Sequence, residues 1–528
     1  MGTYFNPDGK SFVQAVRSKV YVDKTEMLEE LNRMLHTEDK CLAVSHARRF
    51  GKTQAARMVD AYYSRGADSM ELFSKLKISR KADFTEHLNK YNVIHVDVSS
   101  FADRFKDNLV DKIWENLYRE MEEECGQILE SEQTIGAVLM DVYRKTDRPF
   151  VIILDEWDCV VRNHSDRPDL VHKYLQFLHS LFKSEESAHF LALAYITGIL
   201  PVKKIKDESA LNNFIEYTMV NSYELTPYFG FNEEEVQTLC EQYHMDFASV
   251  KEWYNGYKIN GMHMYNPNSV SKAMTKGALE SYWKNTSSFE TINDLISMNF
   301  DGLKEAILTI VEGGRVPVDV EGFKNDLTGI ATKDDALTAL IHFGYLAYDA
   351  EMQEAYMPNF EVKQAYRQAL KSGSWKEIAD TLNKCNEILT ATIRKEGAKV
   401  AEMLEAAHET YTSVLKYNDE NSLSCAITMA YFTAPAYYTV VRELPAGMGF
   451  ADIALIPRRE AGSRPAMILE LKWDQTADTA IKQIKENRYN GALAGCGREV
   501  LLVGVSYDKA AEGESRKKHH CVIEEVAL

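Results

Sequence analysis

A Gly-Lys-Thr triplet between an apolar run and a helical segment constrains the fold of this chain more than any other feature. The apolar run Cys41–Val44 precedes the triplet, and good helix formers follow it at positions 54–59. A strand, a tight turn and a helix that opens at Gly51-Lys52-Thr53 form the build of a phosphate-binding loop. We therefore expect Lys52 to reach the outer phosphates and the Thr53 hydroxyl to ligate Mg²⁺.

The loop departs from the usual pattern at one position. Where a glycine normally stands five residues before the glycine of Gly-Lys, this chain has His46. Arg48 and Arg49 flank the loop, and two roles fit them: contact with phosphate or with a neighbouring subunit's nucleotide, or bracing of the loop by pairing with acids. Phe50 is expected to pack under the loop.

The length and the pattern of apolar segments predict several domains. The 528 residues are too many for one hydrophobic core, and length alone suggests about three domains. In residues 1–225, near-continuous apolar segments alternate with helical patterns, which predicts an α/β domain with a parallel sheet covered on both faces. The expected strands are Cys41–Ser45, Val93–Val98, Phe150–Leu154, Phe190–Ile196 and Tyr217–Val220, and the clearest helices are Asp107–Glu124 and Leu170–Lys183.

Residues 226–395 are predicted to be mostly helical, with Asn232 as the cap of a helix that begins with three glutamates. Within this region a helix over Ala336–His342, a hairpin over residues 344–357 and a helix from Asn359 suggest a winged-helix-like unit. Such a unit binds DNA in some proteins and only packs in others, and packing is the preferred interpretation here.

Residues 396–528 form a third predicted module, of α/β type. A helix over Ser422–Phe432 leads to an extended segment at Tyr437–Leu444. Further strands are expected at Phe450–Ile456, Ala466–Leu471 and Glu499–Ser506, with a helix around Thr476–Tyr489 between the last two.

Two acids at the end of the segment Phe150–Leu154 complete the predicted phosphate site. An acid at the carboxyl end of this strand is expected beside the phosphate loop of the neighbouring strand. Asp155 would then hold Mg²⁺, directly or through water, and Glu156 would polarise the attacking water. Thr197 ends the segment Phe190–Ile196, where it fits either a sensor of the γ-phosphate or water, or a strand cap.

These motifs in combination resemble the AAA-ATPase-like family of bacterial proteins. The resemblance rests on Tyr21–Thr25, Arg48–Thr53, Ile153–Glu156, Thr197-Gly198, Trp253–Tyr257 and Tyr265–Pro267. It implies an additional-strand P-loop ATPase that binds ATP, often followed by a PD-(D/E)xK nuclease-like domain. The family loop commonly reads Arg-Arg-Phe-Gly-Lys without the first glycine, so His46 fits. By analogy the segment that carries Asp23 approaches the nucleotide base, while Trp253–Tyr257 is taken as a structural aromatic turn.

A carboxylate–lysine pattern stands in the last module. Strand alternation puts Glu470 and Lys472 on one face, and Asp452 projects from the preceding strand of a hairpin. Carboxylates on two adjacent strands can hold one or two Mg²⁺ ions, which stabilise charge on a phosphate and activate water. Lys472 can orient that water or stabilise the pentacovalent phosphate.

This pattern resembles the PD-(D/E)xK nuclease superfamily, that is, a restriction-endonuclease-like domain. Gln483 and Tyr489 on the following helix match the resemblance as well. Glu420 and Glu443 compete as the upstream acid that such folds often carry. A fold can keep these residues and still serve only as a binding module, so cleavage is a separate question.

The net charge and the length of the apolar runs limit the classes of partner that this chain could have. The formal net charge of −18 argues against a protein that coats nucleic acid through bulk charge, although a local basic cleft remains compatible with it. Basic residues near the chain's end could follow phosphates, but the tail cluster Arg516–His520 is better explained as a solvated surface. The longest apolar runs are far short of a membrane span, and a cytoplasmic protein is expected.

Two functions follow from the sequence. The first is an ATPase coupled to a metal-dependent nuclease or nucleic-acid-binding domain, with ATP, Mg²⁺ and DNA or RNA as partners. The alternative is a nucleotide-regulated interaction or signalling switch with a catalytically inactive nuclease-like domain, which would include assembly into a homo-oligomer.

Overall fold

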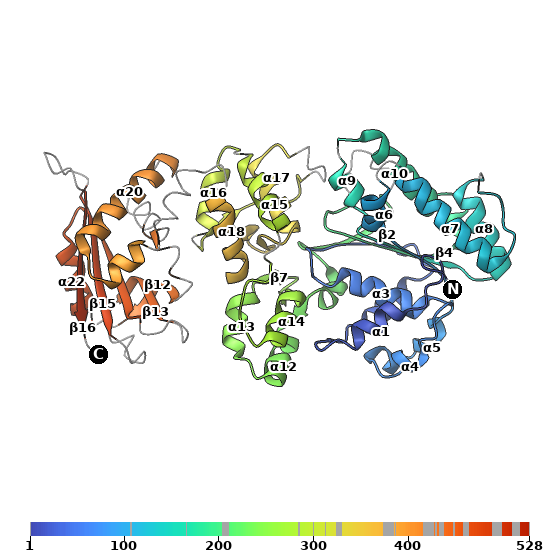
Figure 1. The fold of residues 1–528 in the computed structure, drawn as a ribbon, viewed down its shortest axis with the longest axis horizontal. Helices are drawn as coiled ribbons and strands as arrows, with labels where there is room; N and C mark the ends of the chain where they lie inside the picture. Colours follow the sequence, from blue (N-terminus) through green and yellow to red (C-terminus); the bar gives the residue numbers. More distant parts are fainter. Residues whose placement is uncertain are drawn as a thin grey trace. The chain divides into compact units, whose positions relative to one another are not determined.

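The structure, a computed structural model, is drawn in Figure 1. It describes residues 2–105, 108–131, 133–164, 166–202, 211–283, 286–298, 300–311, 313–323, 330–372, 385, 387–415, 427, 430–431, 434, 438–446, 449–457, 464–487, 499–508 and 518–526. The chain divides into two compact units, one of residues 1–288 and 315–365, the other of residues 289–314 and 366–528. The three-domain boundaries expected from sequence stay a prediction.

A five-stranded parallel sheet forms the centre of the first unit, in the order β2-β3-β4-β1-β5. Its strands are β1 (Cys41–Ser45), β2 (Asn92–Asp97), β3 (Phe150–Asp155), β4 (Leu191–Gly198) and β5 (Ile215–Thr218). The parallel sheet predicted for this part of the chain is therefore confirmed, and each expected strand lies within two residues of its place.

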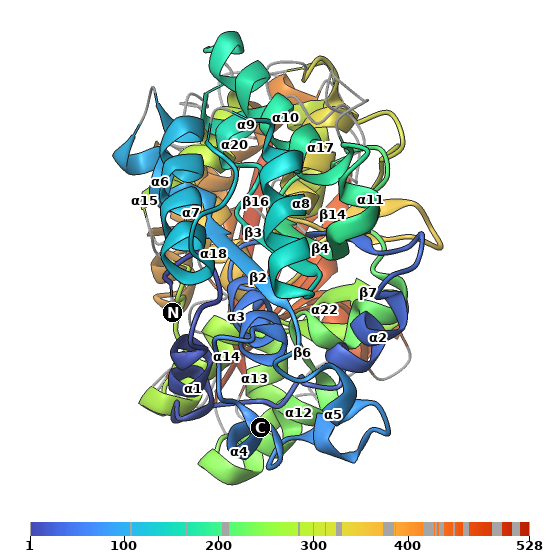
Figure 2. The same cartoon turned by 90° about the vertical axis from the view of Figure 1, so that its right-hand side faces the viewer.

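Alternating side chains bury both faces of this sheet, because successive residues of a strand point to opposite sides. Ala43 and Ile94 join a core with one set of helices, whereas Leu42 and Val93 join a second core with the other set. Figures 1 and 2 show α7, α8 and α10 on one side of the sheet and α1 and α3 on the other. The first set is α6 (Val98–Arg104), α7 (Leu109–Cys125), α8 (Ile135–Thr146), α9 (Cys159–Asn163) and α10 (Pro168–Phe182), and the second includes α1 (Lys10–Val16), α2 (Met27–Met34) and α3 (Lys52–Tyr63).

One detail differs from the sequence-based expectation. The acid-bearing strand β3 does not neighbour the loop-bearing strand β1, because β4 pairs with both and lies between them. This inserted strand fits the additional-strand order that the family resemblance implies. Short elements connect the rest of this region: α4 (Met70–Phe73), η1 (Lys77–Arg80), α5 (Phe84–His87), α11 (Ser187–Phe190) and η2 (Tyr223–Tyr228).

The second half of the first unit is mostly helical, as predicted. Asn232 caps α12 (Glu233–Tyr243) in a capping box with Glu235, which confirms the expected helix start. α13 (Phe247–Tyr254) and α14 (Pro267–Lys276) follow. No sequence pattern predicted the small antiparallel sheet of β6 (Phe231–Asn232), β8 (Met262–Tyr265) and β7 (Tyr257–Ile259).

The predicted helix, hairpin and helix are present. α17 (Lys333–His342) leads to a hairpin of β10 (Ala347–Asp349) and β11 (Glu354–Tyr356), and α18 (Phe360–Ser372) follows. β9 (Arg315–Pro317) adds a third strand on β11. The winged-helix-like arrangement of the middle region is thus confirmed.

The second unit contains a five-stranded mixed sheet in the order β12-β13-β14-β15-β16. Its strands are β12 (Tyr438–Ala446), β13 (Gly449–Pro457), β14 (Ala466–Trp473), β15 (Val500–Tyr507) and β16 (His519–Val526), with α22 (Ala477–Glu486) on β14 and β15. α20 (Gly397–Leu415) packs on β16, and α16 (Leu303–Val311) and most of α15 (Thr286–Ser297) also belong to this unit. The α/β class predicted for the last module is confirmed.

The tail of the chain corrects one expectation. His519 is not a solvated residue: it is buried in β16, where its backbone N–H and its Nδ1 both bond the Glu405 carboxylate, at 2.9 and 3.0 Å. Most of the predicted helix Ser422–Phe432, together with Glu420 and Tyr489, lies outside the described residues.

Candidate nucleotide and metal sites

The phosphate loop runs from the end of β1 to the start of α3. Gly51 has a φ of 96°, a conformation that an L side chain rarely adopts, and α3 begins at the next residue. Arg49 also has a positive φ, of 70°. Two left-handed residues within three positions turn the chain tightly from strand to helix, which leaves the first N–H groups of α3 for an anion.

Lys52 is buried and folds back onto its own loop. Its Nζ donates hydrogen bonds to the carbonyl oxygens of His46 at 2.8 Å and Ala47 at 3.1 Å. Burial lowers the pKa of Lys52, while the nearby carboxylates of Glu156 and Asp155 act in the opposite direction. The ammonium therefore lies between the loop and the acids of β3, although β4 separates the two strands.

His46 is an anchor of the loop. Its Nε2 lies 2.6 Å from the Ser222 hydroxyl, which itself donates to the Thr218 carbonyl oxygen at 2.7 Å. Nε2 is therefore the donor in this pair, and burial lowers the pKa of His46 to about 3, so the ring is neutral. His46 is not among the residues with positive φ, which explains why a glycine is not needed here.

The two acids of β3 and Thr197 form one network. The Thr197 hydroxyl donates to Asp155 Oδ1, and the backbone N–H of Glu156 approaches the same hydroxyl at 3.4 Å. Glu156 has a φ of 53° and lines the cavity described below, whereas Asp155 and Thr197 are buried beneath it. In this structure Thr197 orients Asp155.

Sequence reasoning missed Arg162, the partner of Glu156. The Arg162 guanidinium lies 3.4 Å from Glu156 Oε2 and 3.1 Å from Asp158 Oδ2. Burial opposes its charge, but the carboxylates of Asp158 and Glu156 outweigh burial and raise the pKa of Arg162. The i,i+4 spacing of Asp158 and Arg162 was the available signal, since residues at this spacing share a helix face.

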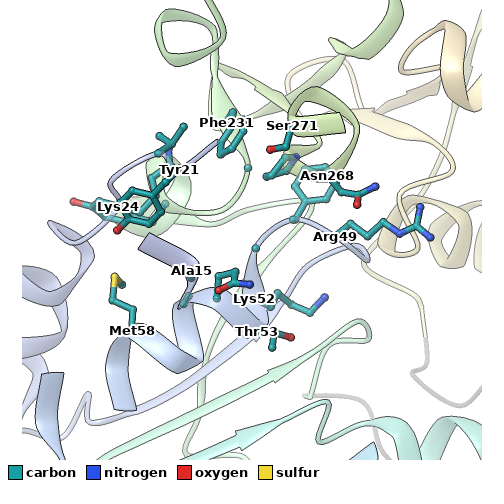
Figure 3. Close-up of a pocket in the computed structure, with 18 of the residues that line it drawn as sticks. Ala15, Tyr21, Lys24, Arg49, Lys52, Thr53, Met58, Phe231, Asn268 and Ser271 are labelled. Carbon is teal, nitrogen blue, oxygen red and sulfur yellow. The ribbon is translucent and has the colours of Figure 1, made fainter. Parts of the chain in front are cut away.

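A cavity of about 580 Å³ opens over the loop. Its loop end is lined by residues 48–55 and Glu156, and its other end by largely apolar residues such as Phe12, Val20 and Met58. Figure 3 shows Lys52 and Thr53 at one side and Phe231, Asn268 and Ser271 at another. Cations at one end and apolar side chains at the other match a ligand with an anionic and an apolar part.

The segment Tyr21–Lys24 forms part of the apolar end. Tyr21 and Val22 line the cavity. Lys24 Nζ bonds Glu235 at 2.6 Å and the Pro227 carbonyl oxygen at 2.6 Å. The Asp23 carboxylate accepts from the Thr25 hydroxyl at 2.7 Å and from the Lys77 N–H at 2.8 Å, and the approach of this segment to a base stays a prediction.

The second half of the first unit braces the loop. The Arg48 carbonyl oxygen accepts from Asn266 Nδ2 at 3.3 Å, and Arg49 Nη1 donates to the Tyr282 carbonyl oxygen at 2.8 Å. The Arg48 side chain is exposed and lines the cavity. Bracing through the Tyr282 carbonyl oxygen is thus one contact of Arg49, and the charge of Arg49 also acts on the Glu361 carboxylate, where it opposes the rise in pKa that burial causes.

Phe50 packs as expected and connects the loop to the aromatic turn. It is fully buried, and its ring meets Tyr257 edge-on with centroids 5.1 Å apart. The Tyr257 hydroxyl bonds the Gly344 carbonyl oxygen at 2.7 Å. A Cβ at Gly256 would lie 1.5 Å from the Pro358 carbonyl oxygen, so this position requires glycine. These contacts fit the structural interpretation of Trp253–Tyr257.

In the second unit, Asp452 lies where two strands separate. β13 and β14 pair from Leu455–Met467 to Ile453–Leu469, and the ladder ends there. Beyond that point the Asp452 carboxylate accepts from the Leu471 N–H at 2.7 Å. The gap places Asp452 beside Glu470.

Glu470 is almost completely buried, with 1% of its surface exposed. Its Oε1 accepts from Lys472 Nζ at 3.1 Å and from Gln483 Nε2, whereas its buried Oε2 has no hydrogen-bond partner in the described part of the chain. Burial, and next the charge of Asp452, raise the pKa of Glu470. A buried carboxylate oxygen without a donor, beside a second carboxylate, fits a divalent cation. The structure therefore brings Asp452, Glu470, Lys472 and Gln483 together.

Of the two candidates for the upstream acid, Glu443 lies in the part of the chain that the structure describes. It has a φ of 49° and lies between the pairs Arg442–Ile453 and Leu444–Ala451, which puts it opposite Asp452. No group of three or more His, Cys, Asp and Glu residues arranged for a metal was found in the ranges that the structure describes. None of the helices in those ranges is long and apolar enough to span a bilayer.

Comparison with known proteins agrees with this architecture. Residues 10–206 match the AAA-ATPase-like family, described as a predicted AAA-ATPase, and residues 419–515 match the PD-(D/E)XK nuclease superfamily. A protein of Azotobacter chroococcum mcd 1, described as an uncharacterized protein in the vnfD 5′ region, is 24% identical over 285 residues. That alignment covers 52% of this chain and 52% of the relative, so the chain matches about half of the relative's length.

Solved structures give weaker likenesses. AMPPCP-bound DnaA from Aquifex aeolicus is 11% identical, with 77% of this chain and 90% of that chain covered and a TM-score of 0.28. The Aeropyrum pernix ORC1 protein in complex with DNA is 11% identical, with 93% and 100% covered and a TM-score of 0.26. Scores this low do not establish a common overall fold. On these matches, the chain carries an AAA-ATPase-like domain over residues 10–206 and a PD-(D/E)XK nuclease superfamily domain over residues 419–515.

Proposed function

We propose that the chain hydrolyses ATP in the first unit and that nucleotide state controls a metal-dependent nuclease site in the second. The observation that carries the first half is the cavity whose cationic end contains Gly51-Lys52-Thr53, with Glu156 beside them, and whose other end is largely apolar. Triphosphate over the loop and base against Tyr21 and Met58 would fill both ends.

The residues present suit Mg²⁺ at the loop. The Thr53 hydroxyl lines the cavity, and one oxygen of Asp155 is already held by Thr197. Hard oxygen ligands of this kind are those that Mg²⁺ prefers, and the ion would neutralise charge on the phosphates. Glu156, fixed by Arg162, would orient and deprotonate the attacking water.

ATP binding and turnover by the purified chain test this proposal. Glu156→Gln should bind ATP with near wild-type affinity and lose at least about a hundredfold in turnover, the usual contribution of a general base. Lys52→Ala should weaken binding itself. Lys75 and Glu71 form an exposed ion pair of 2.8 Å on the surface, so Lys75→Ala and Glu71→Gln are matched controls that should behave as wild type. A wild-type chain that neither binds nor hydrolyses ATP rejects the proposal.

The nuclease half rests on the juxtaposition of Asp452, Glu470 and Lys472. Two carboxylates at a strand separation would hold a divalent cation against a phosphodiester, and Lys472 would stabilise the developing charge. Gln483 holds Glu470 in place. Glu443 would add a third oxygen from β12.

Cleavage of single- and double-stranded DNA and RNA, with Mg²⁺ or Mn²⁺ and with or without ATP, tests the second half. Asp452→Ala and Lys472→Ala should each abolish cleavage. Cleavage that survives both changes comes from another source and rejects this site. Tight ATP binding without cleavage of any substrate would instead support the nucleotide-regulated interaction module.

A further inference from the structure

Asp158 is a buried carboxylate that follows the two acids at the end of β3, with 2% of its surface exposed. Its Oδ2 accepts from the backbone N–H groups of Ile199 at 3.1 Å and Leu200 at 3.0 Å, the two residues that follow β4. The same oxygen lies 3.1 Å from Arg162 Nη1. A buried charge is tolerated where it is paired and hydrogen-bonded, so these three donors fix the position of the Asp158 side chain.

The end of β4 is shaped to receive this carboxylate. A Cβ at Gly198 would lie 2.9 Å from Asp158 Oδ1 and 2.8 Å from Trp157 Nε1, so glycine is what lets both side chains lie against the strand end. The Trp157 backbone N–H also donates to the Thr197 carbonyl oxygen at 2.9 Å. Residues 157 and 158 therefore hold the backbone of β4 at Thr197 and directly after Gly198.

The strand end is held from β1 as well. The Ser45 hydroxyl donates to the Leu200 carbonyl oxygen at 2.9 Å, and the His46 backbone N–H donates to the Gly198 carbonyl oxygen at 3.2 Å. A shift of this strand end would move the Thr197 hydroxyl, which donates to Asp155 Oδ1. The place of that hydroxyl beside Asp155 thus depends on the bonds that Asp158 makes.

Asp158 reaches the second acid through Arg162, whose guanidinium lies between Asp158 Oδ2 at 3.1 Å and Glu156 Oε2 at 3.4 Å. We propose that Asp158 is a positioning residue for both acids of β3: it holds Thr197 beside Asp155 through the end of β4, and it holds Glu156 through Arg162. This inference rests on the proposed ATPase. Because Asp158 is buried, it sets the rate of hydrolysis and not the affinity for ATP.

Steady-state ATP hydrolysis by the full chain, and titration calorimetry with a non-hydrolysable ATP analogue and Mg²⁺, test the inference. Asp158→Ala should bind the analogue as wild type and lower turnover about tenfold to a hundredfold, the scale on which small displacements of reacting groups act. Asp158→Asn can keep an oxygen at the place of Oδ2. Its amide nitrogen would take the place of Oδ1, which has no hydrogen-bond partner in the described ranges. Asp158→Asn should therefore recover most of the lost turnover.

Tyr174→Phe is the matched control. The buried Tyr174 hydroxyl donates to the Trp157 carbonyl oxygen at 2.9 Å, so its removal weakens the same segment and leaves the bonds of Asp158 in place. This variant should lower the thermal midpoint and keep wild-type turnover. Gly198→Ala displaces the carboxylate instead of removing it. It should slow turnover as Asp158→Ala does, and it carries the test if Asp158→Ala does not fold.

The variants separate the outcomes. Wild-type turnover in Asp158→Ala or in Gly198→Ala rejects the inference, and so does a loss of affinity as large as the loss of turnover. If Asp158→Asn is as slow as Asp158→Ala, hydrogen bonding by Asp158 does not set the rate and the inference is wrong. If Tyr174→Phe slows turnover to the same extent, general loss of stability explains the effect. A wild-type chain that does not hydrolyse ATP rejects the proposed function itself, whereas wild-type hydrolysis that is unaffected in these variants rejects this inference alone.

Discussion

Arg49 Nη1 donates a hydrogen bond of 2.8 Å to the carbonyl oxygen of Tyr282, and this contact joins the phosphate loop to the segment that precedes Ser288, where the first stretch of the first unit ends. The backbone N–H groups of Tyr282 and Trp283 in turn donate to Glu361 Oε1, at 2.5 and 3.1 Å. Glu361 stands in the first turn of α18, a helix whose residues beyond Ala365 belong to the second unit. The loop is thus connected to the start of α18 through Tyr282, Trp283 and Glu361, all within the first unit.

Arg49→Ala should lower the thermal midpoint of the nucleotide-free chain. It removes a charged donor from a carbonyl at the centre of this connection, a bond worth about 1.5–3 kcal/mol. Arg48→Ala is the control, because the Arg48 side chain is exposed and the loop contact of that residue is made by its backbone. Differential scanning fluorimetry compares the variants. Equal midpoints for the two would contradict a structural role for Arg49.

Glu361 should make stability depend on pH. Burial raises the pKa of Glu361 from 4.5 to about 7, so the folded chain binds more protons at this residue than the unfolded chain between those values. The contribution of Glu361 to the free energy of unfolding therefore falls as the pH rises through this range. At higher pH the contribution stays at the lower value.

Glu361→Gln should remove that dependence, because an amide oxygen can still accept from Tyr282 and Trp283 but does not ionise. The thermal midpoint of the variant should exceed that of wild type at a pH well above 7, and the difference should shrink toward pH 5. Glu351→Gln, at an exposed position, is the control and should follow wild type. A constant difference across the range would show that Glu361 does not titrate there.

His46→Gly should not improve ATP binding, although it restores the usual loop pattern. The variant loses the bond to Ser222 and the contact with the Phe229 ring, whose centroid lies 5.0 Å away. We expect a lower thermal midpoint with an unchanged or weaker affinity for ATP. Ser222→Ala should destabilise the chain as well, by about 1–3 kcal/mol, because it leaves the buried His46 N–H without an acceptor. Tighter ATP binding by His46→Gly would show instead that His46 lowers the affinity of the loop for ATP.

Local pattern was enough to place the strands and the acids that end them. Runs such as Phe150–Leu154 are apolar because both faces of the sheet are covered. Asp155-Glu156 must then lie where the strand ends, at the carboxyl ends of the parallel strands. Asp452, Glu470 and Lys472 were found for the same reason, since strand alternation fixes which side chains share a face.

Contacts between residues far apart in sequence were not predictable in this way. Nothing in the sequence near Arg49 or Asn266 indicates Tyr282 or the loop as a partner, because these contacts depend on how the helical half packs on the sheet. β16 was missed because His519-His520 resembles a polar tail in the sequence. The Glu405 carboxylate, on α20, bonds His519 and makes its burial favourable.

Mg²⁺ should stabilise the second unit through Glu470. Burial, and next the like charge of Asp452, raise the pKa of Glu470, and its buried Oε2 has no donor among the described residues. A divalent ion would remove both penalties, so the thermal midpoint of the nucleotide-free chain should rise with Mg²⁺ concentration, as expected for any ligand of the folded state.

Glu470→Gln should raise the midpoint without Mg²⁺, because it removes the buried charge while keeping the oxygen that Gln483 and Lys472 contact. The same variant should abolish the response to Mg²⁺. Glu486→Gln, at an exposed ion pair on the same helix as Gln483, should leave the response intact. If Glu470→Gln and wild type respond equally to Mg²⁺, the ion binds elsewhere and the carboxylate pair is a structural feature of the sheet.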